Sequence, residues 1–330
     1  MFSGLVSVAV ILIIFALGFF FHQRRIWPDN TPSGLSAVVI RISAPCLAVT
    51  SIVSGFTRDL LRSSLILLLV AALHILALYV AGKLLSRALR LKDGRKTIFE
   101  VTFTYSNVIF IGLPINQIVF GEEGLPFLFA YYIIILAAFW SFGYAQIAAA
   151  GKLQAGKAEG KAEMREKAAN GPVRRRIPPQ LSKIINPGFI GVIVGYILVE
   201  AGMKLAAPID IAMGYLAGLT VPLSLLVIGA NLTIFAKGIP RVTADEVIIL
   251  LGKFVISPLI MFGLLKALGV DGLPFFVFIL SSSMPCHMQT SIIAQHYGVE
   301  SAYASKLVGL STLLSLITIP IYVAGIHHFM

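Results

Sequence analysis

Ten apolar runs, each about as long as a membrane-spanning helix, follow one another along this chain. They lie near residues 2–21, 34–56, 63–86, 98–119, 125–149, 184–203, 211–233, 244–267, 273–295 and 301–323. An α-helix needs about 20 apolar residues to cross the roughly 30 Å of hydrocarbon in a bilayer. The pattern therefore predicts ten transmembrane helices. The first run has no basic segment before it and no cleavage site after it, which indicates a retained helix and not a signal peptide.

The composition excludes a soluble globule. Of the 330 residues, 58% are hydrophobic and 12% are charged, whereas soluble domains carry roughly 25% charged residues. So little charge cannot cover a water-exposed surface, and we expect an all-α integral membrane protein that is embedded in the lipid bilayer. The two cysteines and the histidines show no spacing typical of metal ligands, so neither a metal nor a cofactor is predicted.

The distribution of Lys and Arg among the loops predicts the orientation. Nineteen of the 26 lie in alternate loops, nine of them in a basic segment at 150–183, and only four lie in the remaining loops. Because cytoplasmic loops are enriched in Lys and Arg, we expect both termini outside and the basic segment inside a multi-pass protein of the plasma (inner) membrane. The net charge of +11 is thus a topology signal, and no nucleic-acid partner is predicted.

A pattern of prolines divides the chain into two halves. Pro45 and Pro114 lie 69 residues apart in the first half, and Pro222 and Pro285 lie 63 residues apart in the second. A half with five spans must return inverted in the membrane, which is the architecture of many secondary transporters. We therefore predict an inverted 5+5 repeat, with five-helix repeats at 1–149 and 184–330 joined by the cytoplasmic basic loop at 150–183.

Polar residues gather around Pro114 in the fourth span and Pro285 in the ninth. Proline lacks an N–H and disfavours helical geometry at the residue before it, so we expect both helices to break there and to restart near residues 115–117 and 286–289. Serines at 281–283 are expected to satisfy the carbonyls that the second break frees. The N-termini of the new half-helices would attract an anion, and the spans show no deep carboxylate for a sodium ion or a proton. The predicted substrate-binding residues are Asn107, Pro114, Asn116, Gln117, Lys253, Pro285, His287 and Gln289.

Two of these assignments have alternatives. Lys253 is equally consistent with a side chain that snorkels toward the cytoplasmic interface. His287 could contact substrate, carry a proton or only close a hydrogen bond, and His74 in the third span is more typical of a packing residue than of a proton relay.

Several motifs resemble one family. Asn107-Val-Ile-Phe-Ile-Gly-Leu-Pro114 resembles the fourth-span signature of the auxin efflux carriers, the family of the plant PIN-type auxin exporters and of many prokaryotic permeases. Pro222-Leu-Ser-Leu-Leu-Val-Ile-Gly-Ala-Asn-Leu232 is similar to its seventh span, and Met284-Pro285 and Tyr297-Gly298 resemble parts of its last two. The resemblance implies broken helices 4 and 9 that cross, and a homodimer, since the family is often dimeric. Gln289 departs from the asparagine that is frequent there, and the missing long loop favours a prokaryotic type.

Together these features predict a secondary transporter, not an enzyme. It would move a small organic anion, such as indole-3-acetate or a dicarboxylate, by alternating access. The alternative is a sodium-coupled transporter of the bile acid sodium symporter type, which shares the general architecture.

Overall fold

The computed structural model describes residues 2–28, 30–55, 65–153, 187–235 and 241–329. These residues are helical almost throughout, and the described part of the chain contains no β-strand, only one isolated β-bridge. From residue 154 onward, the predicted basic loop at 150–183 lies outside the described residues.

Most of the predicted spans coincide with helices long and apolar enough to cross a membrane. Six helices qualify: Thr31–Gly55, Leu65–Ala88, Glu122–Leu153, Ala207–Asn231, Ala244–Ala267 and Ser301–Ile326. Four shorter apolar helices fall in the other predicted runs, at Leu12–Gln23, Val108–Phe120, Ile190–Ala201 and Leu273–Ser282. The described part of the chain therefore fits a helical integral membrane protein, while the count of ten spans stays a prediction.

The elements follow one another in two series. The first comprises α1 (Phe2–Gln23), α2 (Thr31–Val38), η1 (Val39–Ser43), α3 (Ala44–Gly55), α5 (Leu65–Ala88), α6 (Asp93–Thr104), η2 (Val108–Gly112), α7 (Leu113–Phe120), η3 (Glu122–Gly124), α8 (Leu125–Ala138), η4 (Phe139–Gly143) and a helix at 144–153. The second comprises α10 (Pro187–Ala201), α11 (Ala207–Gly218), α12 (Thr220–Asn231), η6 (Leu232–Phe235), α13 (Ala244–Leu251), η7 (Gly252–Ile256), α14 (Ser257–Ala267), α15 (Leu273–Ser282), α16 (Gln289–Tyr297) and α17 (Ser301–Phe329).

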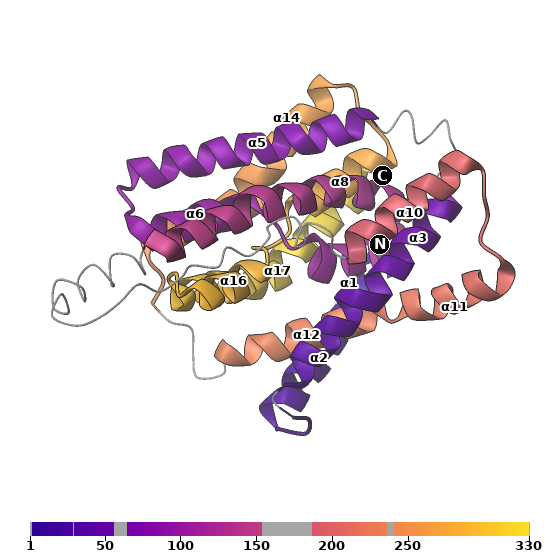
Figure 1. Cartoon of the computed structure of the whole chain (residues 1–330), viewed down its shortest axis with the longest axis horizontal. Helices are drawn as coiled ribbons and strands as arrows, with labels where there is room; N and C mark the ends of the chain where they lie inside the picture. The colour runs from indigo at the N-terminus through magenta and orange to yellow at the C-terminus, as the bar shows by residue number, and fades with distance from the viewer. Residues whose placement is uncertain (1, 29, 56–64, 154–186, 236–240, 330) are drawn as a thin grey trace, which may run out of the picture.

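Figure 1 shows two groups of helices. In one group, α1, α2 and α3 lie with α10, α11 and α12. In the other, α5, α6 and α8 lie with α14, α16 and α17. Each group therefore combines helices from the first and the second half of the chain.

Packing within the first group is reciprocal. The first helix, α1, packs on α12, and α10 packs on α3. Gly18 of α1 faces the backbone of Leu226, and a Cβ added at Gly191 of α10 would lie 2.6 Å from the carbonyl oxygen of Pro45. Small residues allow such close approach where van der Waals packing holds membrane helices together.

Three prolines sit within helices that continue past them. The π-helical turns η1, η2 and η7 end two residues before Pro45, Pro114 and Pro258, respectively. Proline lacks an N–H and its ring clashes with the carbonyl four residues earlier, and a wider turn relieves both problems without ending the helix. The predicted restart after Pro114 is therefore wrong: the helix already begins at Val108, and the chain is interrupted seven residues before the proline, at 105–107.

Candidate functional site

Two helices are each interrupted in the interior of the protein, and the two interruptions contact one another. The first lies between α6 and η2, and the second between α15 and α16, and they join in an antiparallel bridge between Ser106 and Cys286. The N–H of Asn107 donates to the carbonyl of Pro285 at 2.8 Å, and the N–H of His287 donates to the carbonyl of Tyr105 at 3.1 Å. Backbone groups that a broken helix leaves without partners are costly in a membrane interior, so each break partly satisfies the other.

Hydroxyl groups satisfy the carbonyls at the end of α15. Ser282 donates to the carbonyl of Ile279 and Ser283 to that of Leu280, each at 2.8 Å. Ser257 of α14 donates to the carbonyl of Ser282 at 2.7 Å. The carbonyls of Ile279 and Leu280 also accept from the N–H of Ser283, so the serines at 281–283 supplement backbone bonds, and the carbonyl of Ser282 depends on a serine of another helix.

His74 supports this arrangement from α5. Its Nε2 lies 3.1 Å from the carbonyl oxygen of Ser257, and its Nδ1 lies 3.1 Å from the hydroxyl of Tyr131. Both ring nitrogens have partners and the side chain is fully buried, which are the contacts expected of a packing residue.

A small cavity of about 20 Å³, here called the inner cavity, lies beside the bridge. Asn107 reaches it from the start of η2, where its Oδ1 accepts from the N–H of Phe110 at 3.2 Å, and His287 and Gln289 reach it from the second interruption. The remaining lining residues are Ile40, Ala44, Ile109, Phe110, Tyr132, Leu136 and Met288. Three of the predicted substrate-binding residues are thus brought together.

Each of these three residues has a buried polar atom without a hydrogen-bond partner in the described part of the chain. The atoms are Nδ2 of Asn107, Nδ1 of His287 and Oε1 of Gln289. Buried polar groups are normally paired, and an unpaired one costs about 1–3 kcal/mol. Three such atoms around one cavity are typical of a site that is completed by a ligand.

Lys253 lies behind the bridge rather than at the cavity. Its side chain is fully buried, and its Nζ donates to Oγ of Ser106 at 3.1 Å. No carboxylate forms an ion pair with it among the residues that the structure describes. It therefore lies close to the bridge without lining the cavity.

The other predicted residues occupy different places. Pro285 lies within the bridge and accepts the bond from Asn107, whereas Pro114 is buried in the first turn of α7. Asn116 donates to the carbonyl of Gly112 at 2.7 Å and lies 3.4 Å from Oγ of Ser281. Gln117 donates to Glu122 at the exposed end of α7, outside the inner cavity.

Some contributors have no signal in the sequence. The ring of Phe139 stacks on His287 with their centroids 4.2 Å apart, and Tyr132 and Leu136 line the cavity from the preceding turns of α8. They belong to an apolar span in which no polar residue singles them out. Ala44 also lines the cavity, and in the sequence only its place before Pro45 of the second span distinguishes it.

A larger hollow of about 420 Å³, here called the vestibule, lies between α2, α12, α16 and α17. It shares one residue with the inner cavity, Met288, whose Sδ lies 3.7 Å from Nδ2 of Asn231. The side chain of Met288 therefore separates the two spaces.

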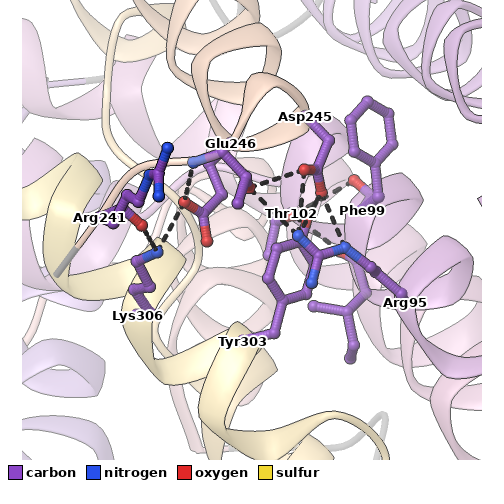
Figure 2. Close-up of polar contacts among 10 residues, drawn as sticks. Arg95, Phe99, Thr102, Arg241, Asp245, Glu246, Tyr303 and Lys306 are labelled. Carbon is purple, nitrogen blue, oxygen red and sulfur yellow. Dashed lines mark hydrogen bonds and ion pairs between the residues drawn. The ribbon is translucent and has the colours of Figure 1, made fainter. Parts of the chain in front are cut away.

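A charged network joins α6, α13 and α17 (Figure 2). Arg95 makes two hydrogen bonds of 3.0 Å to Asp245, which also accepts from the hydroxyl of Tyr303. Hydrogen bonding to Asp245 raises the pKa of Arg95 above its ordinary value. Lys306 forms an ion pair of 2.8 Å with Glu246. The capping box at Thr243 and Glu246 is visible in the sequence and would have placed the start of α13.

The profile of the family described as membrane transport protein (Mem_trans) matches residues 3–323. The chain belongs to this family. Membership in the membrane transport protein family confirms the resemblance to auxin efflux carriers of prokaryotic type.

Three proteins from different organisms are similar to this chain over most of their length. The chain is 27% identical over 323 residues to an "Uncharacterized transporter" of Methanothermobacter thermautotrophicus, covering 96% of each chain. It is 25% identical over 320 residues to another of Methanocaldococcus jannaschii, again covering 96% of each. It is 26% identical over 300 residues to a "Putative malonate transporter" of Rhizobium meliloti, covering 88% of this chain and 86% of that one. Family and names indicate a membrane transporter rather than an enzyme.

Proposed function

We propose that this membrane transporter moves a small organic carboxylate across the plasma membrane by alternating access. The observation that carries the proposal is the set of unpaired polar atoms on Asn107, His287 and Gln289 around the inner cavity. A carboxylate accepts hydrogen bonds at both oxygens, and bonds to an ionised acceptor are stronger than neutral ones. Nδ2 of Asn107 and a protonated Nδ1 of His287 can donate such bonds. The unpaired Oε1 of Gln289 is an acceptor, so Gln289 would bind a carboxylate through its amide Nε2.

The surroundings of the cavity favour an anion. The helix of η2 and α7 begins beside Asn107, and α16 begins at Gln289, so two helix N-termini with partial positive charge flank the site. The ammonium of Lys253 adds a full charge behind the bridge. Since the Rhizobium meliloti relative is named for malonate, a dicarboxylate is the first substrate to test.

The volume of the inner cavity favours a transporter that must change conformation. About 20 Å³ holds roughly one water molecule, which is less than any organic carboxylate needs. The substrate would enter from the vestibule, whose lining helices α2 and α17 follow loops that are predicted to be cytoplasmic. We infer that both termini are outside and that the conformation described here is closed around the site, with its wider opening inward.

The reciprocal packing of α1 on α12 and of α10 on α3 supports an inverted repeat with five helices in each half. In this proposal, the two interrupted helices are the crossing helices 4 and 9. The group that contains them would move against the group of α1, α3, α10 and α12. A homodimer stays a prediction from the family.

Flux of labelled malonate and indole-3-acetate into proteoliposomes tests the proposal. We expect uptake by the wild-type protein, a large loss in Asn107→Ala and Gln289→Ala, and no loss in the matched control Gln117→Ala, because Gln117 lies outside the cavity. Equal uptake by all three variants would show that the site is wrong. Uptake that requires sodium would favour the bile acid sodium symporter type of mechanism instead.

A further inference from the structure

A third cavity, of about 370 Å³, lies where α5 ends, α6 begins and the helix at 144–153 ends. Lys83 and Arg87 reach it from α5, and Lys96 reaches it from the first turns of α6. We call it the basic cavity. It shares no lining residue with the inner cavity or the vestibule, so the proposed transport site does not account for it.

The three cations of the basic cavity form no ion pair within the described part of the chain. Two carboxylates, Asp93 and Glu100, line the same cavity, but Oε1 of Glu100 accepts from Oγ of Ser86 at 2.6 Å. Three cations therefore face two carboxylates across one hollow. The lining therefore has one more positive than negative group, and an excess of positive charge attracts an anion.

The predicted topology explains part of this charge but not its arrangement. Residues 83–97 contain six Lys and Arg, as expected of a cytoplasmic loop. Arg90 and Lys92 are exposed and outside the cavity, and Arg95 pairs with Asp245. Orientation requires only that such residues lie on one side of the membrane. It does not require three of them to line one cavity.

The surroundings of the basic cavity match an amphipathic ligand. The cavity lies at the ends of two helices long enough to span the bilayer, which places it at the depth of the headgroups. Leu153 lines it with 68% of its surface exposed, and Leu84 of α5 is 57% exposed. A phospholipid has the same order, with a phosphate at the interface and acyl chains beside it. Basic pockets between membrane helices bind the headgroups of anionic lipids.

We propose that the basic cavity binds the phosphate of an anionic phospholipid from the inner leaflet. Lys83, Arg87 and Lys96 neutralise the phosphate, and the acyl chains lie against the exposed leucines. The lipid then joins the end of α5 to the start of α6, and α6 is the half-helix that leads to the bridge.

Native mass spectrometry and thermal unfolding in detergent test the proposal with added phosphatidylglycerol or phosphatidylcholine. We expect the wild-type protein to retain phosphatidylglycerol in preference to phosphatidylcholine and to be stabilised by it. In Lys83→Gln/Lys96→Gln, retention should fall about 25-fold, because each basic residue near an anionic membrane surface contributes about fivefold. The control Arg90→Gln/Lys92→Gln has the same change in charge in the same loop and should retain the lipid. Single Lys96→Gln, with an expected fall of about fivefold, serves if the double variant does not fold.

Three outcomes would overturn the proposal. Equal loss in the control variant would mean that the loop attracts the lipid by charge alone. Displacement of the lipid by millimolar inorganic phosphate would assign the cavity to a soluble phosphate. Displacement by malonate would make it a second carboxylate site. None of these results depends on whether the inner cavity transports a carboxylate, so the two proposals fail separately.

Discussion

The N–H of Asn107 bonds to the carbonyl of Pro285 across 2.8 Å and thereby joins two helix interruptions that are far apart in the sequence. Because this bond uses backbone atoms only, the side chain of Asn107 has other roles. Its Oδ1 accepts a hydrogen bond from the N–H of Phe110 and so caps the start of η2. Its Nδ2 faces the inner cavity without a partner in the described part of the chain. The bridge and the binding of a ligand should therefore respond separately to mutation.

Asn107→Ser tests this separation. Serine is as good a helix cap as asparagine, so the thermal stability should change little. The variant lacks the amide donor, and a hydrogen bond to a charged group contributes about 1.5–3 kcal/mol, so carboxylate affinity should fall roughly 10- to 100-fold. Titration calorimetry with malonate measures the affinity, and unchanged affinity would remove Asn107 from the site.

Met288→Ala should connect the vestibule to the inner cavity, since Met288 is the residue they share. We expect the variant to accept bulkier carboxylates that the wild-type protein excludes, as measured by competition with malonate uptake. The control is Ile292→Ala, which shortens a vestibule side chain of the same helix outside the inner cavity. The same competition profile in both variants would show that Met288 does not limit access.

Lys253→Met removes a buried charge that lies behind the bridge without lining the cavity. If the lysine acts through its electrostatic field, affinity should fall about tenfold for a monocarboxylate and further for a dicarboxylate, because the interaction scales with ligand charge. Lys266→Met, which changes an exposed lysine paired with Asp271, should leave both affinities unchanged. An equal decrease for the two ligands would indicate a change in packing.

Asp245→Asn should weaken the network of Figure 2, because Asp245 accepts from both Arg95 and Tyr303. Loss of a partly buried ion pair and weakening of the bond from a buried hydroxyl should lower the free energy of unfolding by about 1–3 kcal/mol. Asp271→Asn breaks an exposed ion pair and should cost less than about 1 kcal/mol. Unfolding in detergent compares the two, and equal costs would mean that the network adds nothing to stability.

Gly191→Ala should strain the contact of α10 with α3, because a Cβ there would lie 2.6 Å from the oxygen of Pro45. Overpacking typically costs about 1–3 kcal/mol. Gly18→Ala should cost at least as much at the contact of α1 with α12, because a Cβ there would lie still closer to the carbonyl oxygen of Leu226. Gly263→Ala meets no atom within 4 Å and should be neutral or slightly stabilising. Unfolding in detergent measures the three variants, and a neutral effect of Gly191→Ala or Gly18→Ala would contradict the close approach of these helices.

The sequence predicted the helical membrane class and the neighbourhood of the second interruption because both depend on local chemistry. Apolar length identifies helices that cross lipid, and a proline beside serines and His287 marks a break whose carbonyls need partners. The first interruption was misplaced because proline has two outcomes that depend on its surroundings. At Pro114 a π-helical turn absorbs the strain, and the chain is interrupted instead at 105–107, where the backbone of the other interruption supplies partners.

Contacts between distant segments could not be predicted from one sequence. Lys253 has the same local pattern whether it snorkels or is buried, and only the packing of η7 behind Ser106 decides the matter. Phe139 and Leu136 look like any other apolar residues of a span. Their role depends on which helix faces the bridge.

The reciprocal packing of α1 on α12 and of α10 on α3 has a consequence for biosynthesis. When the ribosome has completed residues 1–149, the faces of α1 and α3 that pack on α12 and α10 are uncovered, since α10 and α12 have not been made. Although α5 can already pack on α6 and α8, these faces of α1 and α3 must wait in the bilayer, and their contacts with the second half form only after Asn231 has been inserted. Coexpressed as separate chains, the two halves should each be degraded alone and should accumulate only together.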